Sequence, residues 1–347
     1  MQPVIHDPLE SDLTLVYIGA RIGLEHGWSH VYSLALQHEY FTQLRPGAVF
    51  NDGQRFLSPP PLAWITLPLS LLGAAATFYV WLAISFIALV AAWWLAAPGA
   101  GWVRPVWLIG ALAWYPVLYG LSLGQPILLV LLAVAACWKL SESGKPYLAG
   151  VVLAASAIKP QLTLIVPAVL LASGRWRIAA GWAVTTAVLA GASLALMGGE
   201  GLRDYQSLLA EARGVVNNRF FTLALFTGAG WVSSLVQGAV IVVGLVAAYL
   251  NRSSSTGRLI ALGLVTTALS ASYWHLQDYT ILLAAVWLFW RDERPRWQRW
   301  WLLVVVVSLE LAWPLSPGPA LVAIAAWWVM LCIPAQLRKP APMAAAI

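Results

Sequence analysis

The chain has 347 residues, of which 61% are hydrophobic and 10% are charged, and its formal net charge is +6. Because an ordinary soluble domain is about a quarter charged, this composition excludes one and favours a single polytopic membrane domain over 1–347. The 2 cysteines lie in apolar runs, which excludes a disulfide framework and a cysteine metal site. Most of the positive charge lies in short loops between apolar segments, so it does not indicate a nucleic-acid partner.

The first 72 residues are not membrane-like, although nearly everything after them is. Residues 12–24 and 30–44 have the apolar spacing of two amphipathic helices, and Asp12 begins the first. The prolines at 59–61 then stop regular structure and precede a short apolar helix over 62–72, which is too short to cross a bilayer alone. We predict that residues 1–72 form a loop region on the outer membrane face.

Predicted transmembrane helices occupy residues 73–337, so the expected fold is all-α and polytopic. A bilayer needs about 20 apolar residues per span, and fewer where helices are broken inside the protein. Residues 146–172 contain Lys159 and Pro160 in the middle of an apolar run, and we interpret them as a broken pair of half-length helices, 146–157 and 161–172. About nine full spans are expected besides this pair, at 75–97, 104–122, 126–141, 178–197, 230–250, 258–273, 277–290, 299–315 and 318–336.

The basic residues lie in alternate loops, which the positive-inside rule assigns to the cytoplasm. They are Arg104, Lys139, Lys145, Arg175, Arg177, Arg252, Arg258, the segment 291–299, Arg338 and Lys339. The opposite turns then lie outside the plasma membrane, or in the periplasm. Six conspicuous polar residues share that outer face: Asp12, Gln125, Lys159, Arg219, His275 and Asp278.

Asp12 and Lys159 each have a structural and a functional interpretation. Asp12 is either an N-cap, worth about 1 kcal/mol, or a general base that takes a proton from an acceptor hydroxyl. Lys159 either extends its ammonium group to the membrane surface or holds a phosphate or pyrophosphate leaving group, the common anion that a lysine inside a membrane would meet.

Gln125, His275 and Asp278 also leave two interpretations open. His275 and Asp278 are three residues apart, one helical turn, and form either an acid/base or sugar-orienting pair or a structural pair that closes a helix end. Gln125, between Gly124 and Pro126, either marks a tight turn or donates to a phosphate or a sugar.

The remaining polar residues give weaker signals. Arg203, Arg213 and Arg219 lie in the predicted outer loop 198–229, which has the pattern of an amphipathic surface helix that meets lipid headgroups. Glu310 is an unusual carboxylate in an apolar span and a second candidate site.

Metal chemistry is disfavoured by the sequence. The chain has no Asp-x-Asp pair, and its loop histidines, His26, His30 and His38, have no metal-ligand pattern. A metal-dependent enzyme that uses nucleotide sugars is therefore disfavoured, and no phosphate-binding or dinucleotide-binding glycine motif occurs. We expect no cofactor and no metal.

Several short motifs occur in a characteristic order. They are Asp12 with Tyr17, the Pro-Pro before an apolar helix, Gly124-Gln125, Ala157-Ile158-Lys159-Pro160, and Trp274-His275 with Asp278. In this order and spacing, roughly over residues 11–300, the chain resembles glycosyltransferase family 87, polytopic enzymes of the GT-C fold that are similar to polyprenyl-phosphate-mannose-dependent mannosyltransferases.

The resemblance implies that a hexose, often mannose, passes from a polyprenyl-phosphate carrier to a lipid or glycan acceptor on the outer face. It implies that Asp12 is the catalytic base, that Lys159 lies near the carrier phosphate, and that His275 lies close to the reaction centre. We take Asp12 and His275 as the predicted catalytic residues. The predicted substrate-binding residues are Lys159, Gln125, Asp278, Tyr17 and Arg219.

Two features depart from the family pattern. Pro126-Ile127 follows the Gly-Gln motif where the family often has an asparagine, and only about ten polar residues precede Asp12 where the family has a transmembrane helix. We therefore expect that a first helix is missing upstream of Met1.

Two other functions remain as alternatives. A transporter or lipid flippase would spread charges across the bilayer and show inverted repeats. A ligase or polymerase of surface polysaccharide would carry its key arginines in a large late loop.

Overall fold

The computed structural model of the protein describes residues 7–51, 54–215, 219–292 and 295–334. Every regular element in these ranges is a helix, which confirms the all-α prediction. The α-helices are α2 (Leu13–Glu25), α3 (Leu34–Leu44), α4 (Pro60–Ser70), α5 (Ala74–Ala96), α6 (Val103–Ala113), α7 (Tyr115–Ser122), α8 (Ile127–Glu142), α9 (Pro146–Leu153), α10 (Val166–Ala172), α11 (Trp176–Gly214), α12 (Ala224–Thr227), α13 (Trp231–Leu250), α14 (Thr256–Ser270), α15 (Leu282–Arg291), α16 (Arg296–Glu310) and α17 (Gly318–Cys332). Short 3-10 helices are η1 (Pro8–Glu10), η2 (Trp28–His30), η3 (Ala154–Ile158), η4 (Pro160–Leu162) and η6 (Leu276–Ile281).

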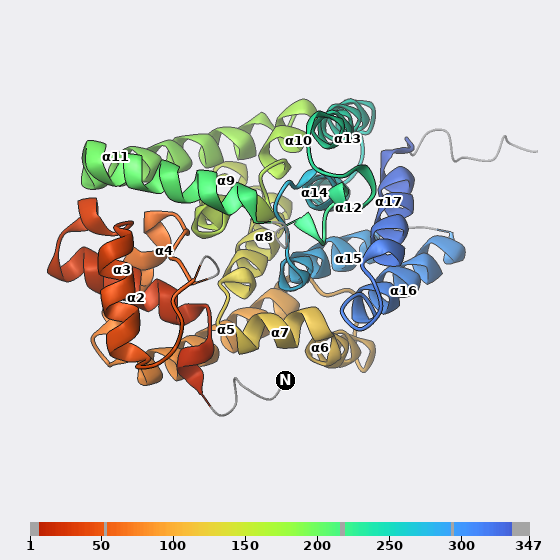
Figure 1. Ribbon diagram of the computed structural model, residues 1–347. Coiled ribbons are helices and arrows are strands. Elements are labelled where there is room, and N and C mark those ends of the chain that lie inside the picture. The colour runs from red at the N-terminus through yellow and green to blue at the C-terminus, as the bar shows by residue number, and fades with distance from the viewer. Residues whose placement is uncertain (1–6, 52–53, 216–218, 293–294, 335–347) are drawn as a thin grey trace, which may run out of the picture.

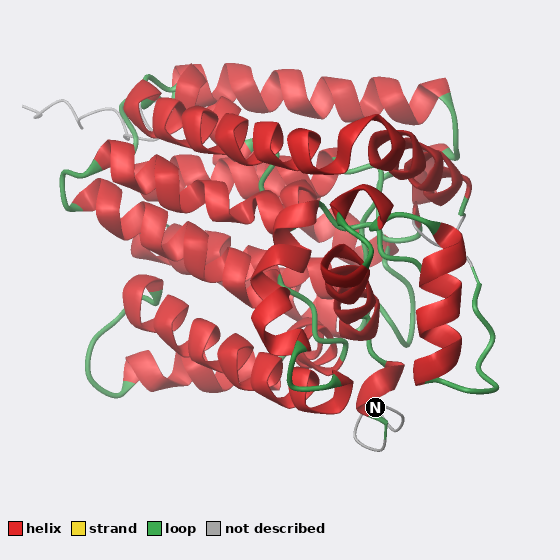
Figure 2. Ribbon diagram, turned by 90° about the vertical axis from the view of Figure 1, so that its left-hand side faces the viewer, coloured by secondary structure: helices red, strands yellow, loops and turns green. Residues whose placement is uncertain are grey.

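Three helices of the described chain, α5, α11 and α13, are long and apolar enough to cross a membrane. The pair α6 and α7 adds a fourth candidate, which is bent by 58° at Trp114 where the sequence predicts one continuous span. The other predicted spans correspond to shorter helices, α8, α14, α15, α16 and α17, and Figure 2 shows helices of the bundle that run side by side. The protein is a polytopic helical membrane protein, and the number of full spans stays a prediction.

Two helices form the centre of the bundle, because α14 and α15 are buried almost all round. Every residue from Gly257 to Leu269 is buried, and so is every residue from Leu282 to Phe289. A helix that is apolar on all sides belongs in the interior of a bundle. Close packing at the periphery uses glycines: a Cβ at Gly150 of α9 would come within 2.0 Å of the backbone oxygen of Ile178 in α11.

The N-terminal helices α2, α3 and α4 form a group at one side of the bundle (Figure 1), and α2 and α4 contribute to its main core. A small apolar cluster of Ile18, Ile22 and Phe41 joins α2 to α3. Helix α11 changes direction at Gly198, whose φ is 61°, and its second part packs on this group. Tyr205 of that part contacts Tyr32, with ring centroids 4.5 Å apart. The predicted surface helix in the loop 198–229 is therefore the end of α11.

The chain breaks at Lys159, between α9–η3 and η4–α10. Proline lacks an N–H and disfavours the helical conformation of the residue before it, and Lys159 accordingly has φ −148° and ψ 72°. The two half-length helices expected over 146–172 therefore meet at an extended lysine, whose side chain is directed toward other elements.

Arginines gather at the end of the bundle that we call the basic end, defined by Arg175, Arg258 and Arg291. Arg258 is 1% exposed and donates to the carbonyls of Leu331 and Ile333 at the end of α17. Arg291 likewise donates to two carbonyls at the end of α5, and Arg175 to carbonyls after α10 and α13. These basic residues close helix C-termini.

Candidate active site

Asp12 immediately precedes α2, at the N-cap position, but its side chain does not cap the helix. Its carboxylate instead accepts a hydrogen bond from the side-chain amide of Gln125. The two segments also meet through their backbones, since the Leu13 N–H donates to the Leu123 carbonyl at 3.2 Å. Of the two interpretations of Asp12, the N-cap is therefore wrong for the carboxylate, which is free to face other groups.

Gln125 lies in a tight turn between α7 and α8, as the first of its two interpretations has it, and its donation to a phosphate or a sugar stays a prediction. Gly124 has a φ of +66°, and a Cβ there would lie 2.7 Å from the Cβ of Leu13. The Gln125 amide nitrogen donates to Asp12, and its oxygen accepts from the Lys159 ammonium at 2.7 Å. An amide offers a donor and an acceptor on one side chain, so Gln125 can bridge a carboxylate and a cation.

Lys159 is 8% exposed, and its charge is paired rather than solvated. Its ammonium lies 2.6 Å from Oδ1 of Asp278, in addition to the contact with Gln125. A buried cation is strongly unfavourable unless it is paired and hydrogen-bonded. The pairing inside the protein argues against the interpretation of Lys159 as a lysine that reaches the membrane surface.

Asp278 is fully buried at the start of η6 and has a structural contact as well as the ion pair. Its Oδ2 accepts the N–H of His275 at 3.0 Å.

The His275 ring packs edge-on against Tyr273, with centroids 4.7 Å apart. Burial lowers the pKa of His275, and the Asp278 carboxylate opposes that shift. The imidazole is therefore mainly neutral near pH 7, with one donor and one acceptor nitrogen.

The electrostatics of the site follow from one continuous series of contacts, Asp12–Gln125–Lys159–Asp278. Burial raises the pKa of Asp12, while the Gln125 hydrogen bond and the Lys159 charge oppose the rise. A carboxylate with a raised pKa is a better general base near neutral pH, provided that it is ionised. The series joins two buried charges, Lys159 and Asp278, to a half-buried carboxylate and amide, Asp12 and Gln125, and a carboxylate beside a cation can serve proton transfer and anion binding together.

Two tyrosines that the sequence did not single out border this network. Tyr273 packs on the His275 ring and lies within electrostatic reach of the carboxylates of Asp278 and Asp12. Tyr119 of α7 lies within electrostatic reach of Asp12. The sequence offers one signal for Tyr273, its place two residues before His275, and none that separates Tyr119 from the interfacial aromatic residues.

Two predicted substrate-binding residues, Tyr17 and Arg219, are not members of the series Asp12–Gln125–Lys159–Asp278. Tyr17 packs against the small cluster between α2 and α3, because five residues along a helix turn its side chain by about 140° from Asp12. Arg219 lies in the loop before α12, two residues from Phe221, whose carbonyl accepts the Tyr279 hydroxyl at 2.8 Å. The loop therefore approaches η6, and the roles of Tyr17 and Arg219 stay predictions. The side chain of Arg213 lies outside the described residues.

The described residues contain no group of three or more His, Cys, Asp or Glu side chains that could hold a metal ion. The series Asp12–Gln125–Lys159–Asp278 contains two carboxylates, an amide and a cation.

Fold and site together define a polytopic helical membrane protein with a buried charged site where broken helices meet. The model of glycosyltransferase family 87 matches residues 56–317. The chain belongs to glycosyltransferase family 87, and it is a membrane glycosyltransferase. No curated protein and no solved structure matches the chain. The matched range includes Gln125, Lys159, His275 and Asp278 and begins after Asp12. The place of Asp12 in the candidate site therefore rests on its hydrogen bond with Gln125.

Proposed function

We propose that the protein transfers a hexose, with mannose favoured, from a polyprenyl-phosphate carrier to a lipid or glycan acceptor at the outer face of the plasma membrane, without a metal ion. The observation that carries this proposal is the series Asp12–Gln125–Lys159–Asp278, which sets a carboxylate beside a buried cation. A polyprenyl-phosphate sugar already contains its leaving group, so a base and a cation suffice for the transfer.

Asp12 is the proposed catalytic base. It takes the proton of the acceptor hydroxyl while the acceptor oxygen forms a bond to the anomeric carbon. The bond between that carbon and the carrier's phosphate oxygen breaks, and its electron pair leaves with the polyprenyl phosphate. The raised pKa of Asp12 supports this role, because it brings the base closer to the pH at which the enzyme works.

Lys159 is the proposed cation for the carrier phosphate. In the structure it contacts Gln125 and Asp278, and both are side chains that can be exchanged for a phosphate oxygen. The ammonium group is a compact charge with three rotatable donors, so it can bind the phosphate and keep one contact to Asp278. Charge that develops on the leaving phosphate is stabilised most strongly where water is excluded.

His275, Gln125 and Asp278 complete the proposed site. The neutral His275 imidazole is suited to orienting a sugar hydroxyl. Gln125 keeps the base and the cation at a fixed spacing, and Asp278 holds both Lys159 and the turn at His275.

The test is transfer of label from radiolabelled polyprenyl-phosphate mannose in membranes that contain the protein or Asp12→Asn. Loss of a general base typically lowers a rate by about 10²–10⁴-fold, and we expect a loss in that range. Glu25→Gln is the matched control, because Glu25 lies at the other end of α2 and pairs with Arg21 on the surface. Transfer by Asp12→Asn at the wild-type rate would refute the role of Asp12 as the general base. No transfer by the wild type from any polyprenyl-phosphate sugar would refute this class of molecule as the donor.

A further inference from the structure

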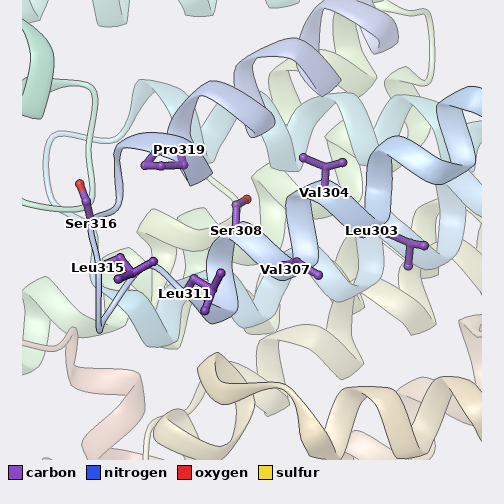
Figure 3. Close-up of a pocket in the computed structure, with 8 residues that line it drawn as sticks. All are labelled: Leu303, Val304, Val307, Ser308, Leu311, Leu315, Ser316 and Pro319. Atoms are coloured by element: carbon purple, nitrogen blue, oxygen red, sulfur yellow. The ribbon is translucent and has the colours of Figure 1, made fainter.

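Glu310 is the last residue of α16, whose residues from Trp300 to Leu309 are apolar apart from Ser308. One side of α16 lines an open apolar groove with the start of α17 (Figure 3). The groove residues are Leu303, Val304, Val307, Ser308, Leu311, Leu315, Ser316 and Pro319. Glu310 is not among them, because its carboxylate is directed toward α7.

The contact of Glu310 is with the backbone of a helix start. Its Oε2 accepts the N–H of Tyr115, the first residue of α7, at 2.7 Å. The first N–H groups of a helix have no partner inside the helix, and the preceding Trp114 provides no side-chain cap. A carboxylate is favourable at a helix N-terminus and unfavourable at a C-terminus. Glu310 therefore stabilises α7 rather than its own helix.

A second bond holds the same bend. The indole N–H of Trp114 donates to the carbonyl of Val306 at 3.2 Å, one turn before Glu310 on α16. Trp114 is the residue at which α6 and α7 diverge by 58°. Helix α16 thus fixes the direction in which α7 leaves the bend.

Helix α7 leads from this bend to the site. It carries Tyr119 and ends just before Gly124 and Gln125. Its residue Gly120 packs against η6, since a Cβ there would lie 3.6 Å from the Cβ of Gln277. Eight helical residues span about 12 Å, so a tilt of about 5° at the start moves the other end by about 1 Å. A misplacement of that size can lower a rate by about 100-fold.

We propose that Glu310 is a positioning residue: by holding the N-terminus of α7, it keeps Gln125 between Asp12 and Lys159. This rests on the proposed function of Asp12 and Lys159. Glu310 touches neither the acceptor nor the carrier in this role, and its carboxylate acts through α7. An acceptor oxygen at this position is the main requirement of the role, and the favourable negative charge at the N-terminus of α7 adds a smaller contribution.

The experiment measures initial rates of transfer from radiolabelled polyprenyl-phosphate mannose, at varied donor concentration and pH, for Glu310→Ala and Glu310→Gln. Glu310→Ala should lower kcat by about tenfold or more, with the donor KM within about twofold. The acid limb of its pH–rate profile, where the rate falls at low pH, should move to higher pH. The reason is that Asp12 loses the Gln125 hydrogen bond, which opposes the rise in the pKa of Asp12. Glu310→Gln keeps an acceptor oxygen and should stay within about threefold of the wild type.

The matched control is Trp301→Phe. Trp301 also lies on α16 and donates to a backbone carbonyl, that of Ala323 in α17. It should lower Tm while kcat stays unchanged. Trp114→Phe removes the second bond at the bend and should lower kcat by about threefold or more. A wild-type kcat in Trp114→Phe would overturn the positioning role even if the alanine variant does not fold.

The outcomes separate the two proposals. Wild-type kcat in Glu310→Ala, or equal losses in the alanine and glutamine variants, would overturn the positioning role when Asp12→Asn is inactive in the same membranes. Full activity of Asp12→Asn would instead overturn the proposed base, whatever the Glu310 variants do.

Discussion

At the basic end, Arg258 and Arg291 donate to backbone carbonyls at the ends of α17 and α5, whereas Lys159 at the site contacts the side chains of Gln125 and Asp278. The two ends are separated by α8, whose first residue follows the Gln125 turn and whose 16 residues span about 24 Å. Glu142, the last residue of α8, lies within electrostatic reach of Arg291. The cations of the two ends thus have different kinds of partner.

The two kinds of partner differ in whether a ligand can take their place. A carbonyl at a helix end cannot move without unfolding the helix, so an arginine that closes it has a fixed structural task. A side-chain partner can rotate away and admit an anion. We therefore expect substitutions at the basic end to change stability alone, and substitutions at the site to change transfer as well.

Lys159→Met should give the largest effect and tests the site end of the comparison. It leaves the buried Asp278 carboxylate without its cation, and breaking a buried pair costs about 3–5 kcal/mol of unfolding free energy. Transfer should fall below detection, because the carrier phosphate loses its cation. Thermal unfolding in detergent and label transfer in membranes measure the two effects.

A double variant separates stability from function. Lys159→Met with Asp278→Asn removes both charges and should regain most of the lost Tm, since no buried charge is left unpaired. It should not regain transfer. A double variant that transfers the hexose at the wild-type rate would show that the ion pair is structural, like the contacts at the basic end.

The sequence predicted which residues form the network, but not how they pair. Lys159 was recognisable because lysine and proline interrupt an apolar run. The distribution of basic residues in the loops predicted that Gln125, His275 and Asp278 lie on the same side of the membrane as Lys159. The contact between Asp12 and Gln125 crosses 113 residues. It depends on the packing of α2 against the end of α7, which local patterns do not encode.

Three other features could not be read from the sequence. Arg258 was assigned to a cytoplasmic loop, yet it is buried, because its partner carbonyls come from the distant α17. Pro116 signals a helix start, but the 58° bend before it also depends on Glu310 of α16. Tyr273 looks like any interfacial aromatic residue until η6 folds beside it.

Arg258→Met tests the basic end and should have an intermediate effect. It removes the donor of buried carbonyls in α17, and an unsatisfied buried group costs about 1–3 kcal/mol. Tm should fall, whereas the transfer rate per folded molecule should stay unchanged. Thermal unfolding and transfer normalised to folded protein check this. A loss of transfer without a loss of Tm would contradict the structural task of Arg258.

Gln125→Met sharpens the role of the site's one neutral member. Its kcat above the acid limb of the pH–rate profile should fall at least as far as in Glu310→Ala, which acts through the same amide, and the smallest expected effect is a shift of that limb. Transfer requires ionised Asp12, so the rate falls as the pH drops through the pKa of Asp12, which burial raises above its usual value of 3.8. Removing the Gln125 hydrogen bond raises the pKa of Asp12 further, so the acid limb moves to higher pH. The loss of one hydrogen bond worth about 1 kcal/mol corresponds to about a fivefold lower rate on that limb.

Binding of the polyprenyl-phosphate donor should also move the acid limb of the wild-type pH–rate profile to higher pH. A carrier phosphate bound near Lys159 adds negative charge beside Asp12, and a neighbouring like charge raises the pKa of a carboxyl group. Because kcat/KM reports the free enzyme and kcat the enzyme–substrate complex, the acid limb of kcat should lie at higher pH than that of kcat/KM. Coincident limbs in the wild type would place the phosphate away from Asp12. An unmoved limb in Gln125→Met would mean that this amide, like the arginines of the basic end, only holds the fold.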